Sequence, residues 1–189
     1  MAAGYGVDRQ PVMYNDFVIV GPASDPAGIR GLASAPDAFR RIAEAQALFV
    51  SRGDESGTHV KEEEVWQAAG ITPAGDWYRS IGQGMGPTLT TAAEIQAYTL
   101  SDRATFLTMK AKGLALEILV EGDANLLNPY SVIAVNPQRY PGICYSGAKA
   151  FIEWITSLPA QELIASFGRD IYGQSIFFPD STTWRQAHR

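Results

Sequence analysis

A short polar stretch of the sequence combines the side chains that best suit the binding of an anion. Hydroxyl groups donate hydrogen bonds, and the planar fork of an arginine matches the paired oxygens of a tetrahedral oxyanion. Glycine lets the main chain approach a ligand closely. All three kinds of residue occur in one run, as Ser51, Arg52, Gly53, Ser56, Gly57 and Thr58. This combination predicts a site for a doubly charged oxyanion.

The elements around this stretch would add backbone donors. Residues 48–50 predict a strand, and residues 59–69 predict a helix that Gly70 ends. A turn between a strand and a helix leaves the first N–H groups of the helix unpaired, and the helix dipole adds partial positive charge there. The candidate oxyanion-binding residues are therefore Ser51, Arg52, Ser56, Gly57 and Thr58.

Each of these residues also has a simpler explanation when it is taken alone. Ser56 or Thr58 would serve as the N-cap of the helix, and Asp54 would close an Asx-turn. A cap needs one hydroxyl, whereas this turn has three hydroxyls, two glycines and an arginine. A binding site accounts better for the whole group.

A second glycine-rich stretch, residues 82–86, precedes another predicted helix. It lacks the Lys-Ser/Thr of a P-loop and does not fit the dinucleotide-binding fingerprint. A flexible loop in which glycine supplies an unusual φ explains it equally well. Two interpretations stay open, one of which assigns further anion contacts to Gly84, Met85 and Gly86.

Other polar and aromatic residues give weaker signals. Residues 101–103, Ser-Asp-Arg, are typical of a salt-bridged turn. His59 is typical of the exposed face of a helix rather than of a ligand. The tryptophans with apolar neighbours are expected in the core, and they are Trp66, Trp77 and Trp154.

Composition limits the class of protein. A chain of 189 residues with 46% hydrophobic content can bury one good core or two small ones. The net charge of −5 and the lack of a Lys/Arg run argue against a nucleic-acid partner. Cys144 is a single cysteine, and His59 and His188 are too few for a zinc site, so we expect no disulfide, metal or cofactor. Without a membrane-spanning run or a signal peptide, the chain as written would stay in the cytoplasm.

Strand and helix patterns alternate along the chain, which predicts an α/β fold. The expected strands are residues 17–22, 48–50, 105–109, 116–120 and 130–137. The expected helices are residues 37–47 with a start near Ser34 or Asp37, 59–69, 91–100 with Thr90 or Thr91 as the N-cap and Glu94 in a capping box, 147–157, and 159–167.

Four blocks of the sequence, in this order, resemble the periplasmic tungstate-binding proteins of tungstate ABC transporters. They are YNDFVIVGP at residues 14–22, SRGDESGTH at 51–59, GMGPTL at 84–89 and NPYSVIAVNP at 128–137. The resemblance extends from residue 4 to residue 179. The Arg-Gly-Asp-x-Ser-Gly-Thr turn alone is only moderately specific, because phosphate- and molybdate-binding relatives use similar turns. The four blocks together are specific.

The resemblance implies a periplasmic-binding-protein-like fold of two α/β lobes that are joined by two crossing strands. It assigns residues 1–22 to a remnant of lobe 1 and the first crossing strand, 23–128 to a complete lobe 2, and 129–189 to the return strand and the C-terminal helices of lobe 1. By the family pattern Arg52 and Thr58 would contact the oxyanion, with Ser51 and Ser56 close by.

The family pattern also includes a signal peptide and an N-terminal part of lobe 1, in which a Thr-Thr-Thr-Ser turn supplies the other half of the anion cage. This chain begins at a point well inside that pattern. The resemblance therefore implies a truncated form of a parent protein that is periplasmic or extracellular. We expect the truncated chain to bind anions weakly and to form a homodimer through unpartnered apolar faces.

The resemblance implies the substrate-binding component of an ABC importer that captures tungstate and delivers it to a membrane permease. The alternatives are a molybdate- or phosphate-binding protein and a cytoplasmic oxyanion-sensing domain. An enzyme, such as a hydrolase with Ser56 as its nucleophile, is disfavoured because His59 is the only histidine within reach and no complete triad is evident. We therefore assign no catalytic residue.

Overall fold

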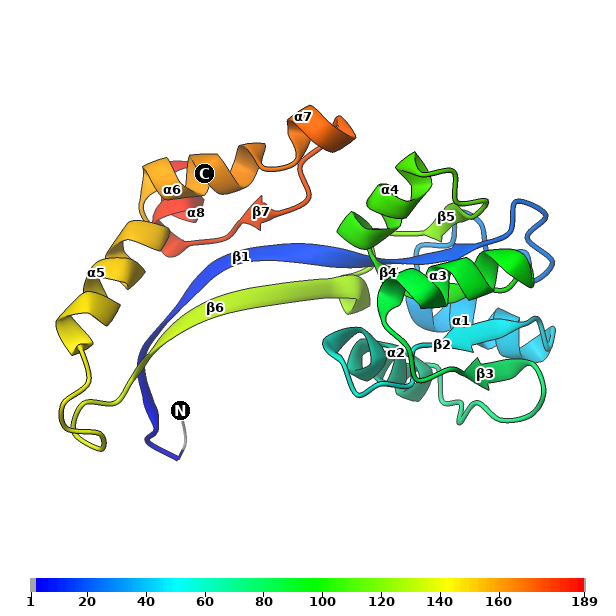
Figure 1. Ribbon diagram of the computed structural model, residues 1–189, viewed down its shortest axis with the longest axis horizontal. Helices are drawn as coiled ribbons and strands as arrows, with labels where there is room; N and C mark the ends of the chain where they lie inside the picture. Colours follow the sequence, from blue (N-terminus) through cyan, green and yellow to red (C-terminus); the bar gives the residue numbers. More distant parts are fainter. Residues whose placement is uncertain (1–2, 189) are drawn as a thin grey trace. The chain divides into compact units, whose positions relative to one another are not determined.

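The computed structural model describes residues 3–188. They form two compact units (Figure 1). Unit 1 contains residues 3–15 and 128–188, and unit 2 contains Asp16–Leu127. Strand β1 (Gly6–Gly21) belongs to unit 1 up to Asn15 and to unit 2 from Asp16. Helices and strands occur in both units, which confirms the α/β class.

The second half of β1 is the central strand of a sheet in unit 2. It pairs antiparallel with β4 (Thr99–Asp102) and with β5 (Glu117–Val120). Successive strand side chains point to opposite faces of the sheet, and both faces here are covered by helices. This burial on both faces explains why residues 17–20 are continuously apolar.

One face of this sheet packs against α1 (Ala35–Glu44) and α2 (Gly57–Ala68), and the other packs against α3 (Met85–Glu94) and α4 (Arg103–Ala111). The first core contains Ile19, Phe39 and Trp66. The second contains Val18, Leu89 and Phe106. A smaller parallel sheet in the same unit consists of β2 (Phe49–Ser51) and β3 (Tyr78–Ser80).

Several of the predicted elements in unit 2 are confirmed. Ser34 is the N-cap of α1 and accepts a hydrogen bond from the amide of Asp37. The strand predicted at residues 48–50 is β2, and the one at 116–120 is β5. Helix α2 starts at Gly57 rather than at residue 59, and Gly70 follows its end with a φ of +72°.

The helix predicted at residues 91–100 was wrong. Helix α3 covers Met85–Glu94, and Thr99–Asp102 forms strand β4. The buried positions of α3 recur at helical spacing, as Met85, Thr88, Leu89 and Ala92. Threonines 90 and 91 therefore lie inside the helix, and the apolar run after it forms a strand because β1 offers a pairing edge.

The strand predicted at residues 105–109 was also wrong, because this segment lies in helix α4. The carboxylate of Asp102 accepts a hydrogen bond from the Thr105 amide at 2.8 Å and caps the helix. Phe106 then anchors the helix in the second core. Capping and packing outweigh the strand-like composition of the segment.

Unit 1 contains the first half of β1, β6 (Leu127–Val135, from its second residue), β7 (Phe178–Pro179) and the C-terminal helices. β6 and β7 both pair with β1, which explains why β1 begins at Gly6 rather than at residue 17. The helices are α5 (Tyr145–Ile155), α6 (Leu158–Ser166), α7 (Arg169–Tyr172) and α8 (Thr182–Ala187). The two helices predicted at 147–157 and 159–167 are confirmed as α5 and α6. A short 3-10 helix, Ala124–Leu126, precedes β6.

A buried amide ties the C-terminal elements of unit 1 together. Gln161 on α6 is 0% exposed. Its side-chain oxygen accepts hydrogen bonds from the amides of Asp180 and Ser181, and its side-chain nitrogen donates to the carbonyl of Ile155. These bonds satisfy a polar group that would otherwise be costly to bury.

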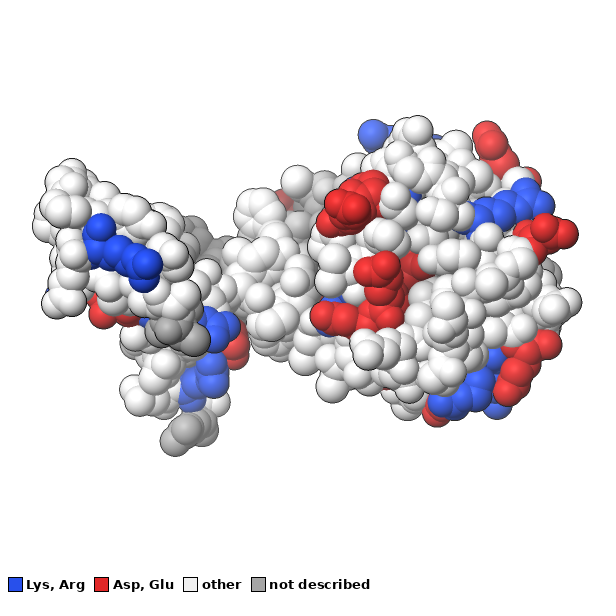
Figure 2. Space-filling model, turned by 90° about the horizontal axis from the view of Figure 1, so that it is seen from below, with Lys and Arg blue, Asp and Glu red and all other residues white. Residues whose placement is uncertain are grey.

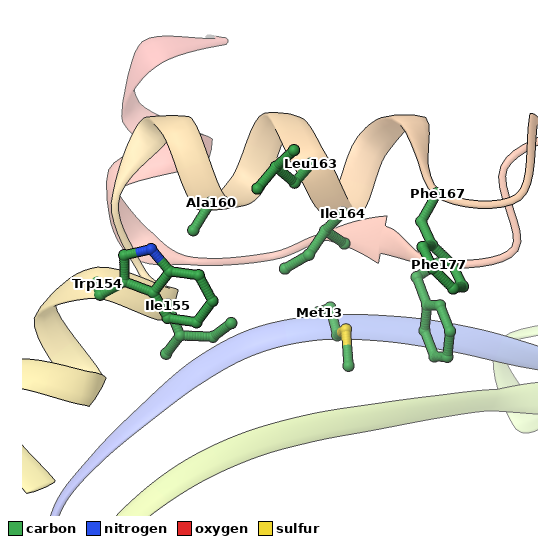
Figure 3. Close-up of a pocket in the computed structure, with 8 residues that line it drawn as sticks. All are labelled: Met13, Trp154, Ile155, Ala160, Leu163, Ile164, Phe167 and Phe177. Carbon is green, nitrogen blue, oxygen red and sulfur yellow. The ribbon is translucent and has the colours of Figure 1, made fainter.

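Helices α5 and α6 expose several large apolar side chains. Trp154 is 54% exposed, so its predicted place in the core was wrong, whereas Trp66 is buried and Trp77 is partly buried against the core. Figure 3 shows a groove in unit 1 that is lined only by apolar side chains, among them Met13, Trp154 and Leu163 (Figure 3). Within residues 3–188 no helix has both the length and the apolar character of a membrane span.

Candidate anion-binding site

The turn after β2 presents the start of α2. Ser56 is the N-cap of the helix, and its hydroxyl accepts a hydrogen bond from the His59 amide at 3.3 Å. Gly57 and Thr58 are the first helical residues, so their N–H groups have no partner within the helix. The capping role of Ser56 therefore coexists with two open backbone donors beside it.

Gly53 holds the turn against strand β3. Its φ is +59°, a left-handed conformation that favours glycine. A Cβ atom at this position would lie 1.8 Å from the Ser80 hydroxyl oxygen. The close approach of the turn to β3 therefore favours glycine here.

Arg52 is partly committed to the turn itself. Its guanidinium donates to Thr58 Oγ1 at 3.4 Å and pairs with the carboxylate of Asp54, while its Nε is buried with no partner among the described residues. A hydrogen bond from the Ser56 hydroxyl lowers the pKa of Asp54 to about 2, and Arg52 contributes to this lowering to a smaller extent. Asp54 is thus ionised at neutral pH and orders the turn. Its charge offsets part of the charge of Arg52.

The second glycine-rich loop lies against this turn. The amide of Gln83 donates to the carbonyl of Arg52 at 3.1 Å, and the amide of Ile81 donates to the carbonyl of Ser51 at 3.2 Å. Gly84 is the N-cap of α3 and has no side chain to cap it. The two stretches that were predicted separately are therefore neighbours.

Helix α3 also begins with open backbone donors. Met85 and Gly86 are its first two residues, so their amides have no helical partner, and Pro87 has no N–H group to satisfy. The starts of two other helices differ, because an acidic side chain already accepts a hydrogen bond from a backbone amide there. Asp123 accepts one from the first amide of α1, and Asp102 accepts one from the Thr105 amide of α4. The starts of α2 and α3 are therefore more favourable for binding an anion, because their first amides are unpaired.

The hydroxyl of Ser51 lies beneath the turn rather than on its surface. Ser51 is 0% exposed, and its Oγ has no hydrogen bond of normal geometry within residues 3–188. It lies close enough to Glu62 and Tyr78 to lower the pKa of both groups. Of the predicted site residues, Ser51 is the one that the solvent does not reach.

Glu62 is a buried acid that the sequence reasoning missed. It is 2% exposed on α2, and burial raises the pKa of its carboxyl, although the hydrogen bonds from Tyr78 and Trp66 and the nearby Ser51 hydroxyl act in the opposite direction. The available signal was the helical spacing that places Glu62 on the same face as Val65 and Trp66.

His59 and Arg103 have structural partners. The His59 Nδ1 accepts a hydrogen bond from the Glu55 amide at 3.1 Å, and its Nε2 is 3.7 Å from Glu63. Arg103 forms two hydrogen bonds with Asp16 and one with Glu121, so the predicted salt bridge is confirmed. The predicted turn is wrong, because residues 101–103 are the end of β4 and the start of α4. On the face in Figure 2, Lys and Arg form small separate groups between acidic residues (Figure 2). Any attraction for an anion on this face is therefore local.

Comparisons with known proteins place these features in a family. Residues 2–158 match the model of the PBP superfamily domain. The chain is 52% identical over 183 residues to a protein of Haloferax volcanii that is provisionally named an ABC transporter anion-binding protein. The matched region covers 94% of this chain and 53% of that protein. It is 50% identical over 185 residues to the tungstate-binding protein TupA of Peptoclostridium acidaminophilum, with 96% and 64% covered.

A solved structure gives the same picture. The tungstate-binding protein TupA from Desulfovibrio alaskensis superposes with a TM-score of 0.88 at 42% identity, covering 95% of this chain and 73% of that one. The chain spans 53% and 64% of the two curated relatives described above.

Proposed function

The chain belongs to the PBP superfamily and, within it, to the TupA-type proteins, and we propose that it carries oxyanion-binding machinery of the substrate-binding component of an ABC importer, with tungstate as the ligand. The observation that carries this proposal is the meeting of two open helix starts, α2 and α3, at the turn that holds Arg52. Such helix starts bind anions through their unpaired amides and their dipoles.

The available groups in the proposed site are donors. The ligand would accept hydrogen bonds from two side chains, the Thr58 hydroxyl and the Arg52 guanidinium. It would also accept them from the backbone amides of Gly57, Thr58, Met85 and Gly86. Both oxygens of the Asp54 carboxylate already accept hydrogen bonds, one from Arg52 and one from the Ser56 amide. A fully deprotonated oxyanion such as tungstate fits a set of donors, whereas hydrogen phosphate would also need an acceptor for its proton. Molybdate shares the charge and shape of tungstate and is the second candidate.

Binding without chemical conversion is part of the proposal. A serine nucleophile needs a base that accepts its proton. The His59 Nδ1 instead accepts a hydrogen bond from the Glu55 amide, and the Ser56 hydroxyl accepts one from the His59 amide. This arrangement supports a capping role for Ser56 and does not support a hydrolase.

The partner and the location follow from the same proposal. We propose that the protein delivers the anion to the membrane permease of an ABC transporter, and that it acts in the periplasm or outside the cell. The names of the relatives, an ABC transporter anion-binding protein and tungstate-binding proteins, support this assignment. We also propose that the chain as given forms a homodimer through the apolar surface of α5 and α6.

Nuclear magnetic resonance tests the site even when binding is weak. Titration of the isotope-labelled chain with sodium tungstate is expected to shift the amide signals of Gly57, Thr58, Met85 and Gly86 together. Titration with molybdate should shift the same signals, and phosphate should have a smaller effect. Shifts that are confined to other segments, or no shifts at a large excess of tungstate, would contradict the proposal.

A further inference from the structure

A buried carboxyl group lies next to the proposed oxyanion site. Glu62 is on the inner side of α2, and its Oε1 accepts hydrogen bonds from the Tyr78 hydroxyl at 2.8 Å and from the Trp66 indole N–H at 3.2 Å. An ionised carboxylate is costly to bury without a cationic partner. Within residues 3–188 no ion pair to Glu62 is formed. The position of this acid therefore needs an explanation beyond packing.

The hydroxyl of Ser51 is the second group that needs an explanation. It is completely buried, directly before Arg52, and it makes no hydrogen bond of normal geometry with another described residue. The Ser51 hydroxyl lies beside the Glu62 carboxyl, where it favours the ionised form. A hydroxyl can donate in only one direction at a time. Its proton is therefore available to only one of Glu62, the Tyr78 oxygen and a ligand.

We propose that Glu62 is a positioning residue, which sets the direction of the Ser51 hydroxyl and thereby controls the affinity of the site for its oxyanion. As a neutral acid, Glu62 donates its proton to Ser51 Oγ, so the Ser51 proton is free to point toward the anion. As a carboxylate, Glu62 accepts the Ser51 proton and places a negative charge beneath the turn. This inference rests on the proposed function and adds a proton-linked control to the same site.

The direction of the linkage follows from the charges. Burial favours the neutral form and raises the pKa of Glu62. A bound divalent oxyanion adds negative charge nearby and raises that pKa further, so binding takes up a proton from the solvent. Because linkage is reciprocal, the anion affinity must fall as the pH rises through the pKa of Glu62.

The surrounding titratable and charged groups define what else could contribute. His59 and Glu63 on α2 act on Glu62 and Tyr78, and Arg52 and Asp54 lie in the turn. Helix α1 and strand β4 also contact α2, and they carry Arg40 and Asp102. Asp54, with a pKa of about 2, stays ionised, and burial raises the pKa of Tyr78. The imidazole of His59 also lies at the turn, where its Nδ1 accepts a hydrogen bond from the Glu55 amide, so the test includes a variant of this residue.

Isothermal titration of the full chain with sodium tungstate measures both affinity and proton uptake when it is repeated in buffers of different ionisation enthalpy. We expect the wild type to take up a proton and to lose up to about tenfold in affinity per pH unit above the pKa of Glu62. Glu62→Gln keeps the shape and an N–H donor toward Ser51. It should bind without this proton uptake and bind more tightly than the wild type at alkaline pH.

Two further variants serve as controls. Glu64→Gln makes the same charge change on the same helix, at a side chain that is 57% exposed, and should titrate like the wild type. His59→Gln removes the imidazole at the turn and should retain the proton uptake. Ser51→Ala leaves Glu62 in place and should reduce the uptake, so it decides the question if Glu62→Gln does not fold.

The outcomes separate this inference from the proposed function. Tungstate binding by the wild type without proton uptake, or uptake that is unchanged in both Glu62→Gln and Ser51→Ala, would overturn the role of Glu62 and leave the binding function intact. If the wild type fails to bind tungstate at every pH, the proposed function is overturned, and the role of Glu62 with it.

Discussion

At the scale of single residues, Arg52 has two tasks. It orders the turn through Asp54 and Thr58, and in the proposed site it also offers donors to the oxyanion. A lysine would keep the charge but would replace the planar fork by a point charge on a flexible stem. Charge alone therefore does not describe what this residue contributes.

Arg52→Lys is expected to weaken tungstate binding far more than the conserved charge suggests. Loss of one charge-assisted hydrogen bond corresponds to about 1.5–3 kcal/mol, or roughly 10- to 100-fold in affinity. Isothermal titration or the amide shifts described above would measure the change. Arg30→Lys, in an exposed ion pair with Glu117, is the control and should have no effect on affinity. Equal affinity of Arg52→Lys and the wild type would remove Arg52 from the site.

Glu62 also affects stability as a function of pH. Its pKa is raised in the folded state, so between the ordinary carboxyl pKa and the raised value the folded protein binds more protons than the unfolded chain. The free energy of unfolding must then fall as the pH rises through that interval. Glu62→Gln should abolish this fall and be the more stable protein above it. Urea unfolding across the pH range tests this, and parallel pH profiles for both proteins would contradict it.

At the scale of elements, the turn between β2 and α2 is held by its neighbours as much as by its own sequence. Gly53 packs against Ser80 of β3, and Gln83 of the second loop donates to Arg52. The loop before α3 therefore supports the turn before α2. A change in the backbone conformation of either loop should therefore change the positions of the first amides of both α2 and α3.

Gly53→Ala should destabilise unit 2 and loosen this arrangement. An alanine at a φ of +59° costs about 1–2 kcal/mol, and its Cβ would also displace the Ser80 hydroxyl. The free energy of unfolding in urea is the measurement. Gly57→Ala is the matched control, because a Cβ there meets no atom within 4 Å and its φ lies outside the left-handed region. It should be neutral or slightly stabilising, and equal losses for both variants would refute the argument.

At the scale of the whole molecule, unit 1 carries an exposed apolar surface on its C-terminal helices. Four large apolar side chains of this surface are between 52% and 65% exposed. They are Phe151 and Trp154 on α5, Leu163 on α6, and Phe167 directly after α6. Contiguous apolar surface of this kind is usually covered by another chain or segment. A second copy of the chain would bury it, as the proposed homodimer requires.

We expect the chain to self-associate on concentration, with an apparent mass above 20.5 kDa that falls on dilution. Light scattering over a dilution series measures this. Leu163→Glu, which places a charge in the apolar groove, should yield a monomer. Ile171→Glu changes a residue that is 78% exposed and does not line that groove, and it should still associate. A monodisperse monomer at every concentration would rule the dimer out.

The local arrangement of the site was largely predictable from the sequence. A strand, a polar turn with glycines, and a helix follow each other at residues 48–69, and β2 and α2 confirm that order. The glycine-rich second stretch could be recognised but not interpreted, because a loop and the uncapped start of a helix have similar composition. Its identity as the start of α3 depends on the packing of Met85, Thr88 and Leu89 into the second core.

Two errors in the fold have the same physical cause. Residues 95–100 and 105–109 have compositions that fit either a helix or a strand over so short a length. The pairing of β4 with β1 decided the first case, and the cap from Asp102 together with the burial of Phe106 decided the second. Neither influence can be read from a window of neighbouring residues.

The sequence by itself determined the α/β class, the oxyanion turn and the resemblance to tungstate-binding proteins, because each depends on residues that are close together in the chain. Only the tertiary structure decided which groups meet around that turn. It placed the start of α3 beside Arg52, buried Ser51, and set Glu62 under the site with Tyr78 and Trp66 as its partners. The reason is burial: the same glutamate is an ordinary charge on an exposed helix face, and it becomes a proton-sensitive group only where the packing of β2, β3 and α2 removes it from water.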